Sequence, residues 1–308
     1  MAENEIAVEV KDLRRTFGSF VAVDDISLKV RKGEIFGFLG PNGAGKSTTI
    51  RMLCGLLMPT GGGGSVAGYD ILGESEQIKK RIGYMSQRFS LYDDLTIEEN
   101  INFFTGIYSV PKDKRRERKE WVLSISGLHE RRKDLTRNLP TGYKQRLALG
   151  CAILHEPSIL FLDEPTSGVD PVSRRSFWKL IYDLAEQGTT VFVTTHYMDE
   201  ADFCGRLALI YRGRIIAEGT PAELRHDFMK REVLEIPVEH PVEAMETLGT
   251  QGIEAVIFGS ALHVVVDDAR AATPEIERVL AQAGLPAGEI AVIVPSLEDV
   301  FVTLIETS

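Results

Sequence analysis

The chain has 308 residues, of which 44% are hydrophobic and 26% charged, and its formal net charge is −10. This composition predicts a globular protein of about two domains and excludes a disordered tail, a fibrous repeat and a disulfide-stapled mini-protein. The three cysteines, Cys54, Cys151 and Cys204, are odd in number and lack metal-site spacing, which favours a reducing compartment. An acidic start and the lack of about 20 consecutive apolar residues predict a soluble cytoplasmic protein.

The charge is unevenly distributed along the chain. Residues 220–308 contain 5 Lys or Arg and 16 Asp or Glu, whereas the part before them contains 30 and 29. We therefore predict a first domain over residues 1–219 and an acidic accessory domain over residues 220–308. The acidic domain argues against nucleic acid as a partner, because phosphates repel it. A basic run over residues 112–119 is more simply a solvated helix face than a contact with anionic lipid head groups.

The first domain opens with strand-like alternation over residues 6–39, and its last part, 34–39, is apolar enough to be a buried strand. A loop at 40–48 and a helical pattern to about residue 57 follow. The four glycines at 61–64 predict a flexible loop before a short strand.

The middle of the first domain is helical by periodicity, and we expect a helical subdomain at about 88–155. Two apolar strands at 159–162 and 190–194 then enclose a helix at about 173–187. This β-α-β unit predicts a mostly parallel sheet core, to which the strand-like start of the chain adds antiparallel β structure.

The acidic domain has the element order β-α-β-β-α-β followed by a last helix. This order is typical of a small ferredoxin-like α+β fold. The elements are predicted at 232–238, 241–249, a hairpin across Gly259 and Ser260, 274–283, 290–294 and 296–306.

A phosphate-binding loop is the most specific signal in the chain. Gly40 and Gly45 frame the pattern G-x-x-x-x-G-K-S between a buried strand and a helix. Glycines let backbone N–H groups turn towards phosphates, and the helix directs its positive end at them. Lys46 would reach the β- and γ-phosphates, and the Ser47 hydroxyl would bind Mg²⁺.

A second acidic signal fits the first. Asp163 and Glu164 end a buried apolar strand, so Asp163 can hold Mg²⁺ through water while Glu164 polarises the attacking water. His196 ends the next strand and should emerge beside Glu164 if the two strands are neighbours.

The order of these motifs resembles the nucleotide-binding subunits of ATP-binding cassette (ABC) transporters over residues 6–219. The resemblance implies a P-loop NTPase cassette with ATP and Mg²⁺ as ligands, Glu164, His196 and Gln87 as catalytic groups, and Ser47, Gln87 and Asp163 at the metal. It places Phe17 against adenine and makes residues 167–170 the D-loop. The phosphate loop comprises Gly40, Pro41, Asn42, Gly43, Ala44, Gly45, Lys46, Ser47 and Thr48.

One motif departs from the family. Its signature is usually Leu-Ser-Gly-Gly-Gln, whereas this chain has Pro140, Thr141 and Gly142 after Leu139. We predict that Thr141 replaces the serine as a hydroxyl donor to ATP bound by the opposite subunit, with the Gly142 N–H beside it. The alternatives are that Thr141 caps its own helix, or that Pro140 simply opens that helix.

The acidic tail resembles the end of ATPase subunits from drug, antibiotic and lipid exporters, whose permease is a separate polypeptide. The resemblance implies an ATPase that works as a homodimer or heterodimer of cassettes, peripheral at the inner face of the membrane. The alternatives are a soluble ABC ATPase not tied to transport, an importer ATPase with a ligand-sensing tail, and an inactive partner in a heterodimer.

We also predict the surface that the permease contacts. Phe89, Leu91 and Tyr92 follow Gln87 in a turn-rich stretch, and clustered exposed apolar side chains usually mark a partner surface. The alternative is that these side chains cover the local core.

Overall fold

The computed structural model describes residues 5–87, 91–229 and 232–306. The chain forms two compact units, Met1–Pro221 and Ala222–Ser308, and the charge step predicts a boundary at residue 220. Within the described residues, no helix combines the length and the apolar character that crossing a membrane requires.

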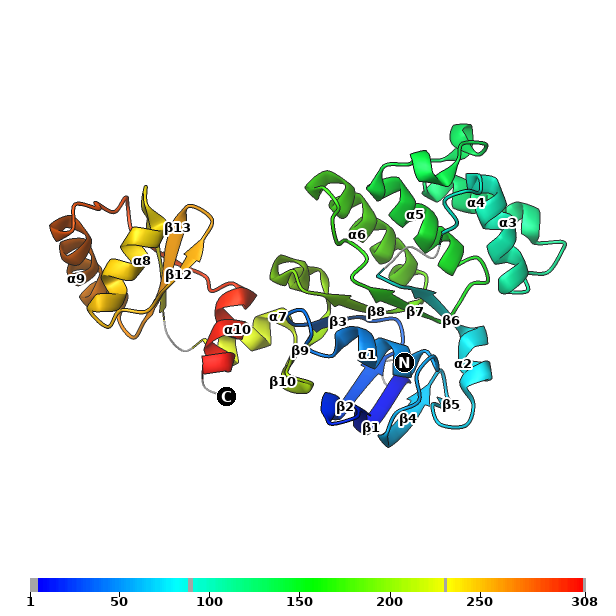
Figure 1. Ribbon diagram of the computed structural model, residues 1–308, viewed down its shortest axis with the longest axis horizontal. Helices are drawn as coiled ribbons and strands as arrows, with labels where there is room; N and C mark the ends of the chain where they lie inside the picture. Colours follow the sequence, from blue (N-terminus) through cyan, green and yellow to red (C-terminus); the bar gives the residue numbers. More distant parts are fainter. Residues whose placement is uncertain (1–4, 88–90, 230–231, 307–308) are drawn as a thin grey trace. The chain divides into compact units, whose positions relative to one another are not determined.

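A six-stranded sheet of order β10-β9-β3-β8-β7-β6 forms the centre of the first unit (Figure 1). Five neighbouring strands are parallel, and β10 pairs antiparallel with β9 at the edge. β3, β7 and β8 are buried along their whole length, as expected of strands covered on both faces. The strands are β3 (Ile35–Leu39), β6 (Ile82–Met85), β7 (Ile159–Asp163), β8 (Thr190–Thr195), β9 (Arg206–Tyr211) and β10 (Arg214–Gly219).

A smaller antiparallel sheet of order β2-β1-β4-β5 lies beside it. Its strands are β1 (Ile6–Phe17), β2 (Phe20–Arg31), β4 (Gly61–Val66) and β5 (Tyr69–Asp70). The flexible loop predicted at the four glycines is therefore wrong, because these residues belong to β4 and pair with β1. A Cβ on Gly62 would lie 2.1 Å from the Asp12 carbonyl oxygen. Glycine is present because the two backbones approach closely.

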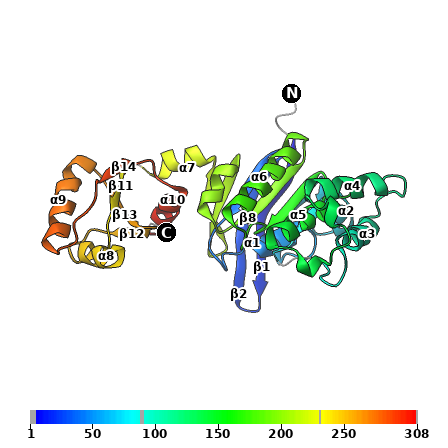
Figure 2. The same cartoon turned by 90° about the horizontal axis from the view of Figure 1, so that it is seen from above.

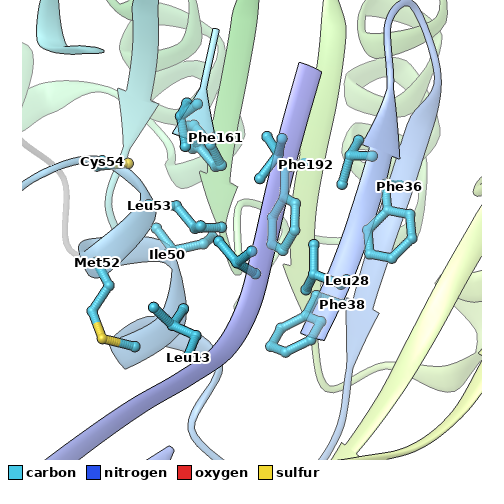
Figure 3. Close-up of a cluster of buried hydrophobic side chains, with 14 of the residues drawn as sticks. Leu13, Leu28, Phe36, Phe38, Ile50, Met52, Leu53, Cys54, Phe161 and Phe192 are labelled. Atoms are coloured by element: carbon cyan, nitrogen blue, oxygen red, sulfur yellow. The ribbon is translucent and has the colours of Figure 1, made fainter. Parts of the chain in front are cut away.

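Two hydrophobic cores cover the faces of the six-stranded sheet. On one face, α1 (Lys46–Leu53) and the antiparallel sheet pack on a group of phenylalanines that includes Phe36, Phe161 and Phe192 (Figure 3). The Phe192 ring centroid lies 5.5–5.6 Å from those of Phe36, Phe38 and Phe161. On the other face lie α5 (Thr141–Ala152) and α6 (Pro171–Glu186). Phe177 and Trp178 of α6 are buried in this second core.

Three helices share a separate core within the region predicted as a helical subdomain. They are α3 (Ile97–Ile107), α4 (Arg115–Ile125) and α5, and Ile101, Val122 and Leu147 pack between them. The short α2 (Ser75–Arg81) precedes β6.

The basic run is part of α4 and of the turn before it. Three of its cations take part in internal contacts: Arg115 Nε donates to the Val110 carbonyl, Arg118 Nε to the Leu154 carbonyl, and Lys119 pairs with Glu98. The other three cations of the run, Lys112, Lys114 and Arg116, are exposed, as expected of a solvated face.

The second unit has the predicted β-α-β-β-α-β order. Its antiparallel sheet has the order β12-β13-β11-β14, and α8 and α9 pack on one face of it (Figure 2). Its elements are α7 (Pro221–Phe228), β11 (Glu232–Pro237), α8 (Pro241–Thr250), β12 (Ala255–Phe258), β13 (Ala261–Val266), α9 (Ala269–Gln282), β14 (Ala291–Ile293) and α10 (Leu297–Glu306).

Helix α9 begins at Ala269, five residues before Pro274, where the sequence predicts its start. Asp268 accepts hydrogen bonds from the backbone of Arg270 and Ala271, so this N-cap starts the helix and leaves Pro274 inside it. A strong cap and an apolar face outweigh one missing backbone hydrogen bond.

Candidate functional site

Most of the predicted site residues lie at the carboxyl ends of four neighbouring parallel strands. In the register, Leu39 of β3 pairs with Thr195 of β8, Thr194 with Asp163 of β7, and Leu162 with Met85 of β6. The phosphate loop, His196, the acidic pair and Gln87 therefore leave the sheet at one edge. This edge is where open α/β sheets bind ligands.

The loop between β3 and α1 has the backbone that a phosphate site requires. Gly45 is the N-cap of α1 with φ of 110°, and Gly43 has φ of 81°. A Cβ on Gly40 would lie 2.2 Å from the carbonyl oxygen of Ile210, so a larger residue has no room there. The positive end of α1 faces the loop, where it favours an anion.

Lys46 is held in the middle of this loop by three acceptors. Its Nζ donates to the carbonyl oxygens of Gly40 and Pro41 at 2.7 and 3.1 Å. The same nitrogen lies 3.1 Å from Glu164 Oε1. Lys46 is 4% exposed and Glu164 6% exposed, so the two charges form a buried ion pair. A buried charge without a partner is strongly disfavoured, which makes the pair mutually dependent.

Glu164 uses its second carboxylate oxygen for two further contacts. Gln87 Nε2 donates to Oε2 at 2.9 Å, and His196 Nδ1 lies 3.1 Å from the same atom. The Glu164 backbone is left-handed with φ of 47°, and its N–H donates to the carbonyl and the hydroxyl of Thr194. Such strained backbone at a non-glycine residue is typical of functional sites.

Asp163 forms the oxygen-rich side of the site. Its Oδ1 accepts from Ser47 Oγ at 3.0 Å and from Thr194 Oγ1 at 2.8 Å. Burial raises the pKa of the Asp163 carboxyl, although these two hydrogen bonds oppose the rise. A carboxylate beside a serine hydroxyl is the oxygen donor set that suits Mg²⁺, so the residues present fit that ion.

Thr194 is a site residue that the sequence analysis missed. It is completely buried and connects Asp163 Oδ1 with the Glu164 backbone N–H. The only available signal was a pair of threonines at the end of an otherwise apolar strand, just before His196.

Three predicted ligand-binding residues lie elsewhere on the first unit. Phe17, 46% exposed, ends β1, and the guanidinium of Arg15 covers its ring at 4.5 Å from the centroid. Thr141 and Gly142 begin α5, and a Cβ on Gly142 would lie 2.8 Å from Ser173 Oγ. Among the described residues we find no contact that joins these three to the Lys46–Glu164 pair.

The start of α5 decides one of the alternatives for Thr141. Pro140 is the N-cap, with φ of −57°, and no side chain caps the helix. The hypothesis that Thr141 caps α5 is therefore wrong. Thr141 is exposed on the first turn, and Pro140 opens the helix as its fixed φ allows.

A glycine-rich turn before a helix, a buried lysine in it and a strand-end carboxylate beside a serine hydroxyl define the class of P-loop nucleoside triphosphatases. Comparisons with known proteins identify the family within this class. The sequence model of the family described as "ABC transporter" matches residues 23–167.

Individual relatives agree with this match. The probable multidrug ABC transporter ATP-binding protein YbhF of Escherichia coli is 51% identical over 221 residues, which are 72% of this chain and 38% of YbhF. The daunorubicin resistance ATP-binding protein DrrA3 of Streptomyces coeruleorubidus is 33% identical, covering 97% of this chain and 96% of DrrA3. The chain belongs to the ABC transporter family, and it spans only 38% of the length of YbhF.

Solved structures have the same fold over the first unit. A dimeric, post-hydrolysis ATP-binding cassette bound to ADP and Pi superimposes with a TM-score of 0.63 at 26% identity, covering 69% of this chain and 98% of that one.

The buried carboxylate of Asp163 generates a pH-dependent prediction. Because its folded pKa is raised above the ordinary value of 3.8, the ionised form destabilises the ligand-free protein at neutral pH. This cost is absent when the pH is below the ordinary pKa. It grows as the pH rises from the ordinary pKa to the raised pKa, and it is constant at higher pH. Asp163→Asn should therefore melt at a higher temperature than the parent at pH 7, and the difference should vanish on acidification. A variant less stable than the parent at pH 7 contradicts this explanation.

Proposed function

We propose that this chain binds and hydrolyses ATP as the ATPase subunit of an exporter, and that a separate membrane permease uses this energy for efflux. The observation that carries the proposal is the Lys46–Glu164 pair, with Gln87 and His196 on the second carboxylate oxygen. The relatives' names, multidrug transporter and daunorubicin resistance, support an export role.

Binding of ATP begins at Lys46. The phosphates offer the ammonium group several negative oxygens, and the N–H groups of the loop and of α1 add further donors. We infer that Lys46 turns from Glu164 to the phosphates. The Oε1 atom of Glu164 then loses its counter-charge and becomes free to accept a hydrogen bond from water.

Glu164 then acts as the group that polarises the attacking water. The contacts from Gln87 and His196 to Oε2 hold the carboxylate plane while Oε1 faces the substrate. This arrangement uses positioning and electrostatics, the main sources of catalysis in phosphoryl transfer.

Mg²⁺ fits beside Asp163, where Ser47 and Gln87 would complete the protein ligands. The amide nitrogen of Gln87 donates to Glu164, which leaves the amide oxygen for a cation. When bound, Mg²⁺ would neutralise charge on the phosphates.

Lys46 and Glu164 should act at different steps. Lys46→Ala removes the phosphate counter-charge and should weaken ATP binding. Glu164→Gln should keep binding and trap a closed dimer, because the ATP phosphates replace the counter-charge that Lys46 loses while the water-polarising group is missing. Nucleotide titration and size-exclusion chromatography with ATP separate the two variants. Hydrolysis by Glu164→Gln at the parent rate would contradict the role proposed for Glu164.

The exposure of the altered signature segment supports the proposed dimer. Thr141 is exposed at the start of α5, as a hydroxyl must be to reach ATP on an opposite subunit, and Phe17 keeps exposed area for adenine. The positive end of α5 adds to the attraction for a phosphate.

Thr141 should matter for closure and not for folding. Loss of a hydrogen bond to a charged acceptor, on the order of 1.5–3 kcal/mol, should slow turnover of Thr141→Ala by roughly ten- to a hundredfold. The melting temperature should stay near that of the parent because Thr141 makes no cap, and Thr141→Ser should restore most activity. Unchanged ATPase activity and ATP-dependent dimerisation in Thr141→Ala would eliminate the trans-donor hypothesis.

The permease is proposed to contact a groove beside the Gln87 segment. A cavity of about 220 Å³ there is lined by Leu56, Tyr84, Leu91, Phe104 and Tyr108, among others. Leu91 also packs against two cores, so the local-core alternative applies to it. Phe89 lies outside the described residues.

Two exposed side chains, Leu56 in the lining of the cavity and Tyr92 next to Leu91 in the sequence, give a direct test of docking. Leu56 is 48% exposed, and Tyr92, 47% exposed, packs edge-on against Phe103 at 4.7 Å. Leu56→Glu with Tyr92→Glu should abolish co-purification with the permease and recruitment to the inner membrane face while leaving the melting temperature unchanged. Val242→Glu, at an exposed apolar position of α8, is the matched control. Co-purification of the double variant at the parent level would contradict the docking site.

A further inference from the structure

The first turn of α6 connects three of the predicted functional segments. Asp170 of the D-loop accepts hydrogen bonds from Val172 N and Ser173 N and so caps the helix. Ser173 lies against Gly142 of the signature segment. The next residue, Arg174, extends to the segment after β8, which carries His196.

Arg174 makes three contacts with this segment. Its guanidinium lies over the ring of Tyr197, 4.4 Å from the centroid. One terminal nitrogen donates to Asp199 Oδ2 at 3.2 Å, and Nε lies 3.5 Å from Glu200 Oε1. A guanidinium held by carboxylates on one side and an aromatic face on the other has little freedom to move.

The burial of Glu200 explains why the Arg174 guanidinium stays next to this segment. It lies in the 3-10 helix η3 (Met198–Phe203) and is completely buried. Neither carboxylate oxygen has a hydrogen-bond partner within the described residues. A buried carboxylate needs a counter-charge, and Arg174 provides it.

Tyr197 transmits the position of Arg174 to the site. Its ring centroid lies 4.1 Å from that of His196. Its backbone N–H donates to Thr195 Oγ1 at 3.0 Å, which fixes the turn between the strand and the two rings. His196 in turn lies 3.1 Å from Glu164 Oε2.

We propose that Arg174, anchored by the buried Glu200, is a positioning residue that holds Tyr197 and thereby aims His196 at Glu164. The inference rests on the proposed ATPase function, since it assigns Arg174 to that same site. Arg174 does not touch substrate; it acts through the rings of Tyr197 and His196.

The kinetic test uses variants that separate folding from positioning. Arg174→Met leaves Glu200 buried and unpaired and can unfold the chain, whereas Arg174→Met with Glu200→Gln removes both charges. This double variant should retain its fold and KM for ATP, while kcat falls by about ten- to a hundredfold because His196 is misaimed. Arg174→Lys, which keeps the charge, should retain part of kcat. Lys179→Met, an exposed cation on the same helix, should match the parent.

A cycle with His196→Ala shows whether Arg174 acts through the histidine. In that background the double variant should cause no further loss of kcat. A parent-like kcat in the double variant, or an equal loss with and without His196, would overturn the proposal.

Imidazole NMR spectra give a readout that does not depend on turnover. The ring signals of His196, assigned with His196→Ala, should shift in the double variant and stay in place in Lys179→Met. Overlaid His196 signals in the parent and the double variant would refute the positioning role. If the parent hydrolyses no ATP, the proposed function fails by itself, and the spectra still decide the role of Arg174.

Discussion

The buried ion pair between Lys46 and Glu164 is the contact on which the rest of the site depends. It joins the loop after β3 to the end of β7, and both charged side chains are buried. Such a pair is costly to break by removing one partner, on the order of 3–5 kcal/mol, because the remaining charge stays buried. Under the proposed function, an incoming phosphate would avoid that cost for Lys46 by replacing one negative partner with another.

The parallel register explains why so many groups converge on this pair. Four strands end at one edge, so Gln87, Glu164, His196 and the phosphate loop meet although they are far apart in sequence. The Thr194 hydroxyl then connects the two neighbouring acidic residues, because it donates to the Asp163 carboxylate and accepts from the backbone N–H of Glu164. In the structure both carboxylate oxygens of Glu164 have partners, and the proposed function requires that ATP binding exchanges one of them.

Much of this arrangement was predictable because its signals are local. Apolar strands followed at once by Gly40, Asp163 or His196 predict both the sheet and the edge where these residues lie. The β-α-β-β-α-β order of the second unit follows in the same way from periodicity and turns. Thr194 and the pair of Arg174 with Glu200 were not predictable, because their roles depend on contacts between distant segments.

Local rules also failed where tertiary contacts decide the backbone. The four glycines of β4 form a strand because β1 approaches too closely for any side chain. Pro274 lies inside α9 because Asp268 caps the helix earlier. In the signature segment, Pro140 occupies the cap position, and Thr141 is exposed on the first turn of α5.

The most direct test of the central claim is a crystal structure of the chain with Mg²⁺ and a non-hydrolysable ATP analogue. We expect Lys46 Nζ on phosphate oxygens and no longer within ion-pair distance of Glu164 Oε1, with Gln87 or His196 still on Oε2. A structure with nucleotide bound and the Lys46–Glu164 pair intact would contradict the account.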